Sequence, residues 1–180
     1  VLVRKELGIQ HPKLQSIVAD FDRLDAADIV ADDVFCCLGT TMKKAGSKEA
    51  FYKVDFTYPH EIAKKALANG AKRFAIVTAM GADSKSLFYY NRVKGDIEQS
   101  LRKLDFKTLL IFRPSLLLGE RNESRLGEKI GESLAKAFRF LTPAKYQAIE
   151  ADKVARAMVA ITSSNVEGQV VYQSDVMQEF

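Results

Sequence analysis

Residues 73–101 read RFAIVTAMGADSKSLFYYNRVKGDIEQSL, in which an apolar run, a loop and an amphipathic stretch follow one another directly. The run from Arg73 to Thr78 is continuously apolar after its first residue, as is typical of a strand covered on both faces. A helix is expected from about Tyr89 to Leu104, because apolar residues recur there at helical spacing: Val93, Ile97, Leu101 and Leu104. A buried strand followed by a helix is the repeating unit of a parallel sheet.

The remainder of the chain repeats this alternation, which predicts an α/β fold with a doubly wound parallel sheet. Further strands are expected at Val1–Val3, Ser16–Ala19, Val34–Leu38, Thr108–Phe112 and Gln169–Tyr172. Further amphipathic helices are expected at about Pro59–Asn69, Leu126–Phe138 and Val154–Val159. With 180 residues, of which 47% are apolar, we expect one domain spanning residues 1–180.

Composition argues against several classes of partner. The net charge of +4 and the pI of about 9.0 come from basic residues interleaved with acids, without a basic cluster that alternates with aromatic residues, so we expect no nucleic-acid binding. Two histidines and no C-x-x-C pattern give no support for a metal site. The adjacent Cys36 and Cys37 would point to opposite faces of a strand, which suits free thiols in a reducing compartment.

The N-terminal stretch VLVRKELG has no hydrophobic signal region, and no long apolar run follows it. From these features we expect a cytoplasmic protein without a membrane segment.

Doubly wound sheets bind ligands beyond the carboxyl ends of their strands. The residues that follow the expected strands are polar or turn-forming: Arg4-Lys5, Asp20-Phe21, Gly39-Thr40-Thr41, Thr78-Ala79-Met80-Gly81 and Arg113-Pro114-Ser115. Tyr90 opens the next helix beside this edge, and Lys94 lies one turn further along the same face. A candidate site is therefore expected at this edge of the sheet.

Four stretches together resemble the atypical branch of the short-chain dehydrogenase/reductase superfamily. They are DDVFCCLGTTMKKAGSKEAFYKVDF (32–56), GAKRFAIVTAMGAD (70–83), FYYNRVKGDIE (88–98) and LIFRPSLLLGER (110–121). The resemblance extends from Val1 to about Thr162. It implies a Rossmann-type fold and a nicotinamide cofactor.

The resemblance also implies catalytic roles. Tyr90 would be the general acid/base for hydride transfer between the nicotinamide and a carbonyl or alcohol. A free phenol has a pKa near 10, so Lys94 would stabilise the phenolate and also bind the nicotinamide ribose. The usual serine that orients the substrate is replaced by Thr78-Ala79. Thr78 could fill that role or merely cap the strand, and Ser84 or Ser86 could substitute for it.

Residues at the other strand ends would hold the cofactor. Arg4 and Lys5 favour the 2′-phosphate of NADP, although Glu6 leaves NAD possible. The remaining expected contacts are with Asp20 and Phe21 at the adenine, Leu38, Gly39, Thr40 and Thr41 after the next strand, and Pro114, Ser115 and Leu116 at the nicotinamide. Gly39 could equally be an ordinary turn glycine.

In the family's strand order the first strand is central, between the strands at Val1–Val3 and Val34–Leu38. Neither it nor its glycine-rich phosphate loop is found in the sequence, so we expect that about 30 residues, a β-α unit, are absent from the sequence as given.

Two functional classes follow. One is an NADP-dependent oxidoreductase, monomeric or homodimeric, that acts on a small carbonyl or alcohol; residues 119–146 would form a helix and loop on the substrate side. The other is an NAD(P)-binding regulatory or scaffold protein with weak or no catalysis, which Ala79 would favour.

Overall fold

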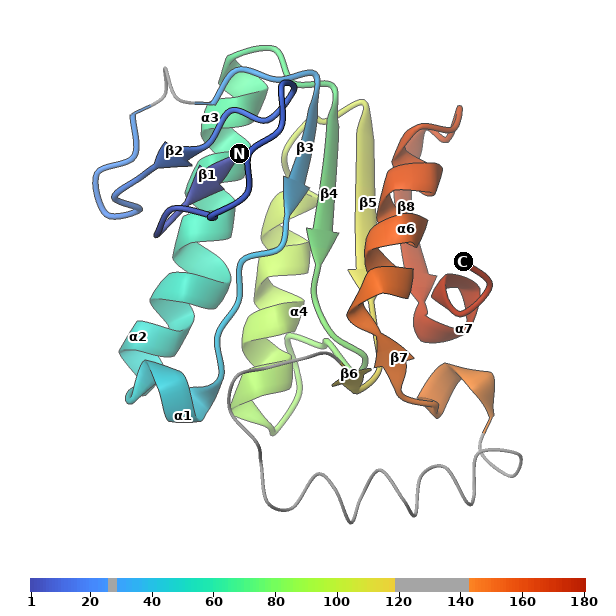
Figure 1. Ribbon diagram of the computed structural model, residues 1–180. Helices are drawn as coiled ribbons and strands as arrows, with labels where there is room; N and C mark the ends of the chain where they lie inside the picture. Colours follow the sequence, from blue (N-terminus) through green and yellow to red (C-terminus); the bar gives the residue numbers. More distant parts are fainter. Residues whose placement is uncertain (26–28, 119–142) are drawn as a thin grey trace.

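The computed structural model describes residues 1–25, 29–118 and 143–180. Its main sheet has four parallel strands in the order β3-β4-β5-β8, formed by β3 (Asp33–Cys36), β4 (Arg73–Val77), β5 (Thr108–Arg113) and β8 (Gly168–Gln173) (Figure 1). Two short parallel pairs accompany it, β1 (Leu2–Val3) with β2 (Ile17–Val18) and β6 (Leu117–Leu118) with β7 (Ile149–Glu150). The described residues thus form a parallel α/β fold, as predicted.

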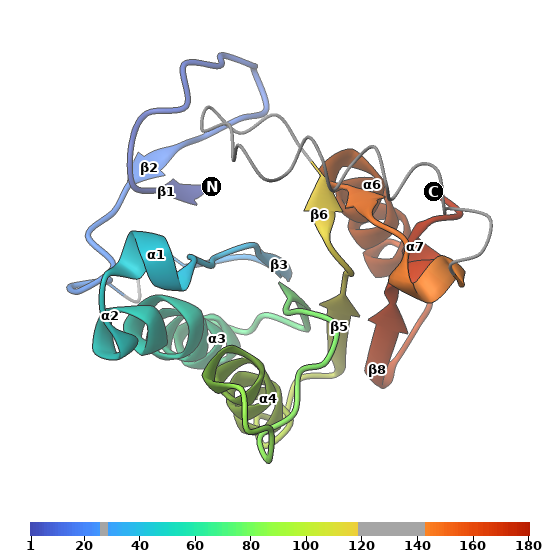
Figure 2. The ribbon, with the colours of Figure 1, turned by 90° about the horizontal axis from the view of Figure 1, so that it is seen from below.

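Helices cover both faces of the main sheet. Seen along the strands, α3 (Tyr58–Ala68) and α4 (Tyr89–Leu101) lie on one face and α6 (Ala151–Thr162) lies on the other (Figure 2). The shorter helical segments are α1 (Met42–Ala45), α2 (Lys48–Tyr52), the π-helix η2 (Lys53–Thr57), the 3-10 helix η3 (Ala144–Tyr146) and α7 (Ser174–Met177).

Alternating strand residues divide the core into two layers. Phe74, Ile76, Leu109 and Ile111 belong to the cluster that contains Ile62, Ala63 and Ala66 of α3 and Ile97 and Leu101 of α4. Their neighbours Ala75, Leu110 and Phe112 belong to the cluster with Val154, Ala157, Met158 and Ile161 of α6. Because neighbouring strand residues face opposite sides, an uninterrupted apolar run serves both layers.

Cys36 provides a test of this core. Its thiol is fully buried, and burial raises its pKa from 9.0 to about 12. A thiol whose pKa is higher in the folded protein than in the unfolded chain contributes stability at a pH below the unfolded pKa. That stability is lost as the pH rises from about 9 towards 12. We expect Cys36→Ala to lessen the fall in unfolding free energy by about 1 kcal/mol between pH 9 and pH 10, as measured by urea denaturation.

The neighbouring thiol is the control for this prediction. Cys37 is exposed and, like Cys36, makes no disulfide, and partial burial raises the pKa of its thiol less than that of Cys36. Cys37→Ala should therefore retain most of the alkaline loss of stability. Equal pH dependence in the unaltered protein and in Cys36→Ala would contradict the burial of this thiol.

The expected strands and helices that fall within the described residues are present, with corrected ends. The helix expected from Pro59 is α3, but helical backbone begins earlier, because α2 and η2 lead directly into α3. Tyr58 N bonds to Lys53 O, and this wider π-helical turn directly precedes the proline, which has no N–H to donate. The helix expected to reach Leu104 ends at Leu101, and β3 ends at Cys36. The helix expected at 126–138 lies outside the described residues.

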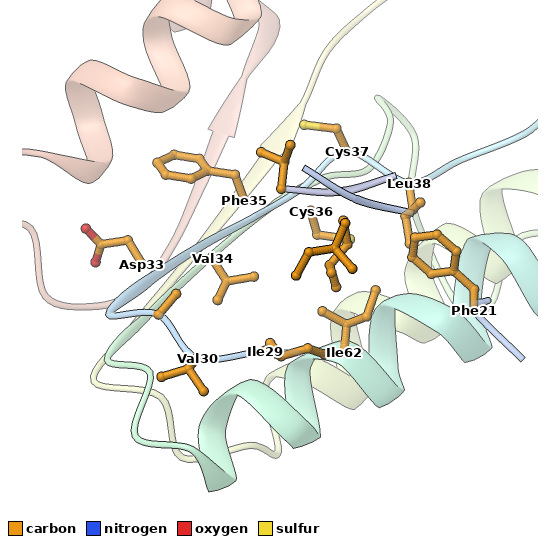
Figure 3. A pocket seen from close by; sticks show the side chains of 14 residues that line it. Phe21, Ile29, Val30, Asp33, Val34, Phe35, Cys36, Cys37, Leu38 and Ile62 are labelled. Atoms are coloured by element: carbon orange, nitrogen blue, oxygen red, sulfur yellow. The ribbon is translucent and has the colours of Figure 1, made fainter. Parts of the chain in front are cut away.

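β1 and β2 do not join the main sheet. Between β1 and β3 lies an apolar hollow of about 620 Å³, lined by Leu2, Ile17, Phe21, Val34, Cys36 and Ile62 among others (Figure 3). The unpaired edge of β3 borders this hollow, and no strand within residues 1–25, 29–118 and 143–180 pairs with both β1 and β3. The hollow lies where we expected the central strand of the sheet.

Candidate functional site

The face of α4 that carries Tyr90 and Lys94 packs against α2 and η2. The ring of Tyr90 lies 5.6 Å from the ring of Phe51, centroid to centroid, and 38% of Tyr90 remains exposed. One turn further along, Lys94 Nζ lies 2.7 Å from Asp55 Oδ1. Phe51 and Asp55 are separated by the same number of residues as Tyr90 and Lys94. The predicted pair therefore shares one face, with its phenol partly open and its ammonium enclosed.

The ion pair between Lys94 and Asp55 is almost fully buried. The side chain of Lys94 is 6% exposed and that of Asp55 is 0% exposed. Asp55 Oδ2 accepts a hydrogen bond of 2.9 Å from the backbone N–H of Thr40, in the loop after β3. Oδ1 faces the Lys94 ammonium at 2.7 Å, the distance of a charge-assisted contact. One carboxylate thus connects the catalytic candidate on α4 to the loop expected to bind cofactor.

Gly39 lies directly beside this ion pair. A Cβ added at Gly39 would stand 3.4 Å from Asp55 Oδ1 and 3.7 Å from Lys94 Nζ. Gly39 itself is exposed, so a bound molecule could approach the backbone above the pair. Both Gly39 and Thr40 were predicted from sequence, whereas Asp55 was missed. The available signal was that Asp55, in YKVDF, is an acid one helical turn after Phe51, at a position where a buried apolar residue would be expected.

A second buried network fixes α4 to the sheet. Glu98 Oε1 accepts hydrogen bonds of 2.7 Å from Thr78 Oγ1 and 2.9 Å from Arg113 Nε, and Glu98 Oε2 pairs with Arg113 Nη2. The hydrogen bond to Glu98 raises the pKa of Arg113. Met80 N also donates to Pro114 O at 2.9 Å, which joins the ends of β4 and β5. The carboxyl edge of the sheet is therefore firmly held beneath the candidate site.

The hydroxyls considered for substrate binding all have partners. Thr78 is buried, and its single hydroxyl proton is donated to Glu98. Ser84 Oγ accepts a hydrogen bond from Gln99 Nε2, and Ser86 Oγ accepts one from Phe88 N. These contacts give Thr78 a structural role, and its role in catalysis stays a prediction.

Four of the residues predicted to bind cofactor line a second hollow, of about 560 Å³. These residues are Arg4, Lys5, Phe21 and Leu38. The two cationic residues directly follow β1, which pairs only with β2, and both are exposed. Leu38 directly precedes Gly39, so this basic hollow adjoins the cluster of Gly39, Asp55 and Lys94.

The remaining residues predicted to bind cofactor or substrate do not line the basic hollow, and several of them make hydrogen bonds to nearby residues. Asp20 Oδ1 accepts from Asp22 N, and Thr41 Oγ1 accepts from Lys44 N and caps α1. The Ser115 hydroxyl contacts Gln147 O and lies 2.9 Å from Ser174 Oγ, on the side of α7. Pro114 is buried, whereas Leu116 is 62% exposed. The predicted substrate segment 119–146 is described only from residue 143 onward.

Gly95 supports the site and was not predicted. It is buried in the middle of α4, directly after Lys94. An added Cβ would overlap the backbone of Asp83 and Ser84, which belong to the loop between β4 and α4. The absence of a side chain therefore lets this loop pass against the helix.

Two other features are absent from the described ranges. No helix there is long and apolar enough to cross a membrane. No group of three or more His, Cys, Asp or Glu side chains within residues 1–25, 29–118 and 143–180 could hold a metal ion.

A parallel α/β sheet with polar residues gathered at the carboxyl ends of its strands defines a Rossmann-type domain. A solved structure of MoeE5 in complex with UDP-glucuronic acid and NAD shares this fold, with a TM-score of 0.70 at 13% sequence identity. The match covers 97% of this chain and 70% of MoeE5. The described residues therefore share the Rossmann-type fold of this NAD complex.

The HIM1 family model matches residues 18–146, and the chain belongs to the HIM1 family. Protein HTATIP2 of Rattus norvegicus is 41% identical over 176 residues, which cover 93% of this chain and 71% of the rat protein. Protein FMP52, mitochondrial, of Candida albicans is 35% identical over 147 residues, covering 78% of this chain and 63% of that protein.

The names of the fungal relatives correct one expectation. FMP52 proteins from three fungi are named as mitochondrial. Our expectation of a cytoplasmic protein is therefore wrong. It rested on the lack of a hydrophobic signal region, a criterion that addresses export and not entry into organelles.

Proposed function

We propose that the protein is an NADP-dependent oxidoreductase that transfers hydride between the nicotinamide and a carbonyl or alcohol substrate. The observation that carries this proposal is the shared face of Tyr90 and Lys94, with Lys94 fixed by Asp55 beside Gly39 at the carboxyl edge of the sheet. A partly exposed phenol one turn from an enclosed ammonium is an arrangement suited to proton transfer.

The residues present fit one half of a dinucleotide well. Gly39 leaves open backbone beside Lys94, which could donate to the hydroxyls of a ribose. The adjoining hollow presents Arg4 and Lys5, whose charges suit a phosphate. None of the described helices begins with a glycine-rich loop at the centre of the sheet, so these residues alone supply no cradle for the pyrophosphate.

When bound, the nicotinamide would supply or accept the hydride. Tyr90 would donate a proton from its phenol oxygen to the carbonyl oxygen of the substrate, or remove one from an alcohol in the reverse direction. Lys94 would stabilise the phenolate that results. The loss of NADPH absorbance with a panel of aldehydes and ketones tests this activity.

Arg4 tests the choice of cofactor. Replacing Arg4 by Ala removes a charge-assisted contact to the 2′-phosphate, so we expect NADPH to bind roughly tenfold more weakly, a loss of about 1.4 kcal/mol. NADH lacks that phosphate, and its affinity should barely change. Fluorescence titration with both cofactors measures the difference.

Lys13 provides the matched control, because it is an exposed cation near the N-terminus that does not line the basic hollow. Lys13→Ala should leave both affinities unchanged. Equal losses for NADPH and NADH in Arg4→Ala would show that Arg4 does not recognise the 2′-phosphate.

One observation favours a second function. Thr78 donates its hydroxyl proton to Glu98, and the next position is Ala79, so this strand end offers no free hydroxyl donor to a substrate. A protein that binds NAD(P) for regulation or as a scaffold would need no such donor. Dinucleotide binding without turnover across the carbonyl panel would support this alternative.

A further inference from the structure

Helix α4 carries two buried charges of opposite sign, one turn apart. Lys94 and Glu98 could pair with each other along the helix. Each instead pairs with another element, Lys94 with Asp55 of η2 and Glu98 with Arg113 of β5. The position of each charge is thus determined by a partner outside the helix.

We propose that Asp55 is the positioning residue for Lys94, an inference that rests on the proposed function of this site. A lysine ammonium on its flexible four-carbon stem normally extends into water. Here it stays enclosed, 2.7 Å from a carboxylate whose other oxygen accepts the N–H of Thr40. Asp55 holds the charge of Lys94 against the loop that would receive the ribose.

The backbone around Asp55 supports this role. Asp55 lies in the π-helix η2, between α2 and α3. Short π-helical segments within longer helices occur frequently at functional sites. The segment also carries the buried Asp55 into an interface that includes Phe51 and Tyr90, whose rings are in contact.

The first test measures where the Lys94 amine lies, without any cofactor. Acetylation rates of individual lysines would be measured by mass spectrometry in the full-length protein and in Asp55→Asn. We expect Lys94 to react at least about tenfold faster in Asp55→Asn, because the released side chain reaches solvent. Lys72 and Lys107, whose side chains are 67% and 62% exposed, serve as internal references and should not change.

Asp33→Asn is the matched control. Asp33 pairs with Arg73, a residue of similar partial exposure, and the two are the first residues of the parallel strands β3 and β4, at the end of the sheet away from Lys94. This variant loses an ion pair and should leave the rate at Lys94 unchanged. A rate at Lys94 in Asp55→Asn within twofold of the unaltered protein would overturn the proposal.

A second variant covers the case in which Asp55→Asn does not fold. Removing one partner of a buried ion pair leaves an uncompensated charge, whereas removing both charges is often tolerated. The double variant Asp55→Asn, Lys94→Met should therefore regain most of the lost unfolding temperature. A double variant no more stable than Asp55→Asn would show that the two residues are not coupled, contrary to the proposal.

Titration of the same proteins with NADPH separates this inference from the proposed function. We expect at least about tenfold weaker binding in Asp55→Asn and unchanged binding in Asp33→Asn. Equal affinity in Asp55→Asn and the unaltered protein overturns the link between Asp55 and the cofactor site. If Lys94 becomes reactive but the unaltered protein binds no dinucleotide, the positioning of Lys94 by Asp55 stands and the oxidoreductase function fails.

Discussion

Replacing Tyr90 by Phe should lower turnover by about 10²–10⁴-fold, since the variant loses only the hydroxyl that would transfer the proton. The Tyr90 ring packs on Phe51, and Phe preserves that contact. Cofactor affinity and unfolding temperature should therefore stay close to their original values. Turnover would be measured with the best substrate from the carbonyl panel, together with NADPH titration of the same preparation.

Tyr89→Phe is the matched control for this experiment. Tyr89 adjoins Tyr90, but its hydroxyl donates to the backbone O of Lys48 at 2.9 Å. Its loss should cost some stability and little turnover. If the rate survives Tyr90→Phe within about threefold, Tyr90 is not the general acid/base, and the regulatory function gains support.

Lys94→Ala should differ from Tyr90→Phe in its effect on cofactor affinity. It should reduce turnover and also weaken cofactor binding, because the same ammonium would contact the ribose. It also leaves the Asp55 carboxylate buried without its cation, which is destabilising. Lys94 variants are therefore best interpreted together with unfolding measurements.

Gly95→Ala should destabilise the fold by about 3 kcal/mol, because the new Cβ would overlap the backbone of Asp83 and Ser84. Helix propensity alone would favour alanine by about 1 kcal/mol in the middle of a helix. A net loss in urea denaturation would therefore demonstrate the close approach of the loop to α4. The loss is large because backbone on both sides must move apart.

Gly39→Ala provides the comparison. Its added Cβ would make only ordinary contacts, 3.4 Å and 3.7 Å from Asp55 and Lys94. We expect little change in its unfolding free energy. If Gly95→Ala were as stable as the unaltered protein, the packing of residues 83 and 84 on α4 would be wrong.

The sequence predicted the strands and helices of the sheet well, because their apolar runs and periodic faces are local signals. It also placed Tyr90 and Lys94 on one face of a helix at the correct edge. Asp55 was missed, since its partner Lys94 is distant in sequence and the π-helix changes the register of the preceding turn, so the acid among apolar residues gave only a weak signal. Gly95 escaped for a similar reason, because its contact with Ser84 depends on the path of a loop.

The strand-end residues show the same limit. The carboxyl ends of parallel strands could be listed from sequence, and Arg4, Lys5, Phe21 and Leu38 do gather at one hollow. The direction of each side chain depends on neighbours that no local pattern reveals. Thr78 donates to Glu98, and Ser115 contacts Gln147 and Ser174, so both hydroxyls have partners within the fold.

We propose that the edge of the sheet beside Lys94 binds a nicotinamide dinucleotide with a preference for NADP. Fluorescence titration of the full-length protein with NADPH and NADH tests it most directly. We predict saturable binding of both, about tenfold tighter for NADPH, a ratio that one charge-assisted contact can supply. Absence of saturable binding by either dinucleotide would contradict the claim.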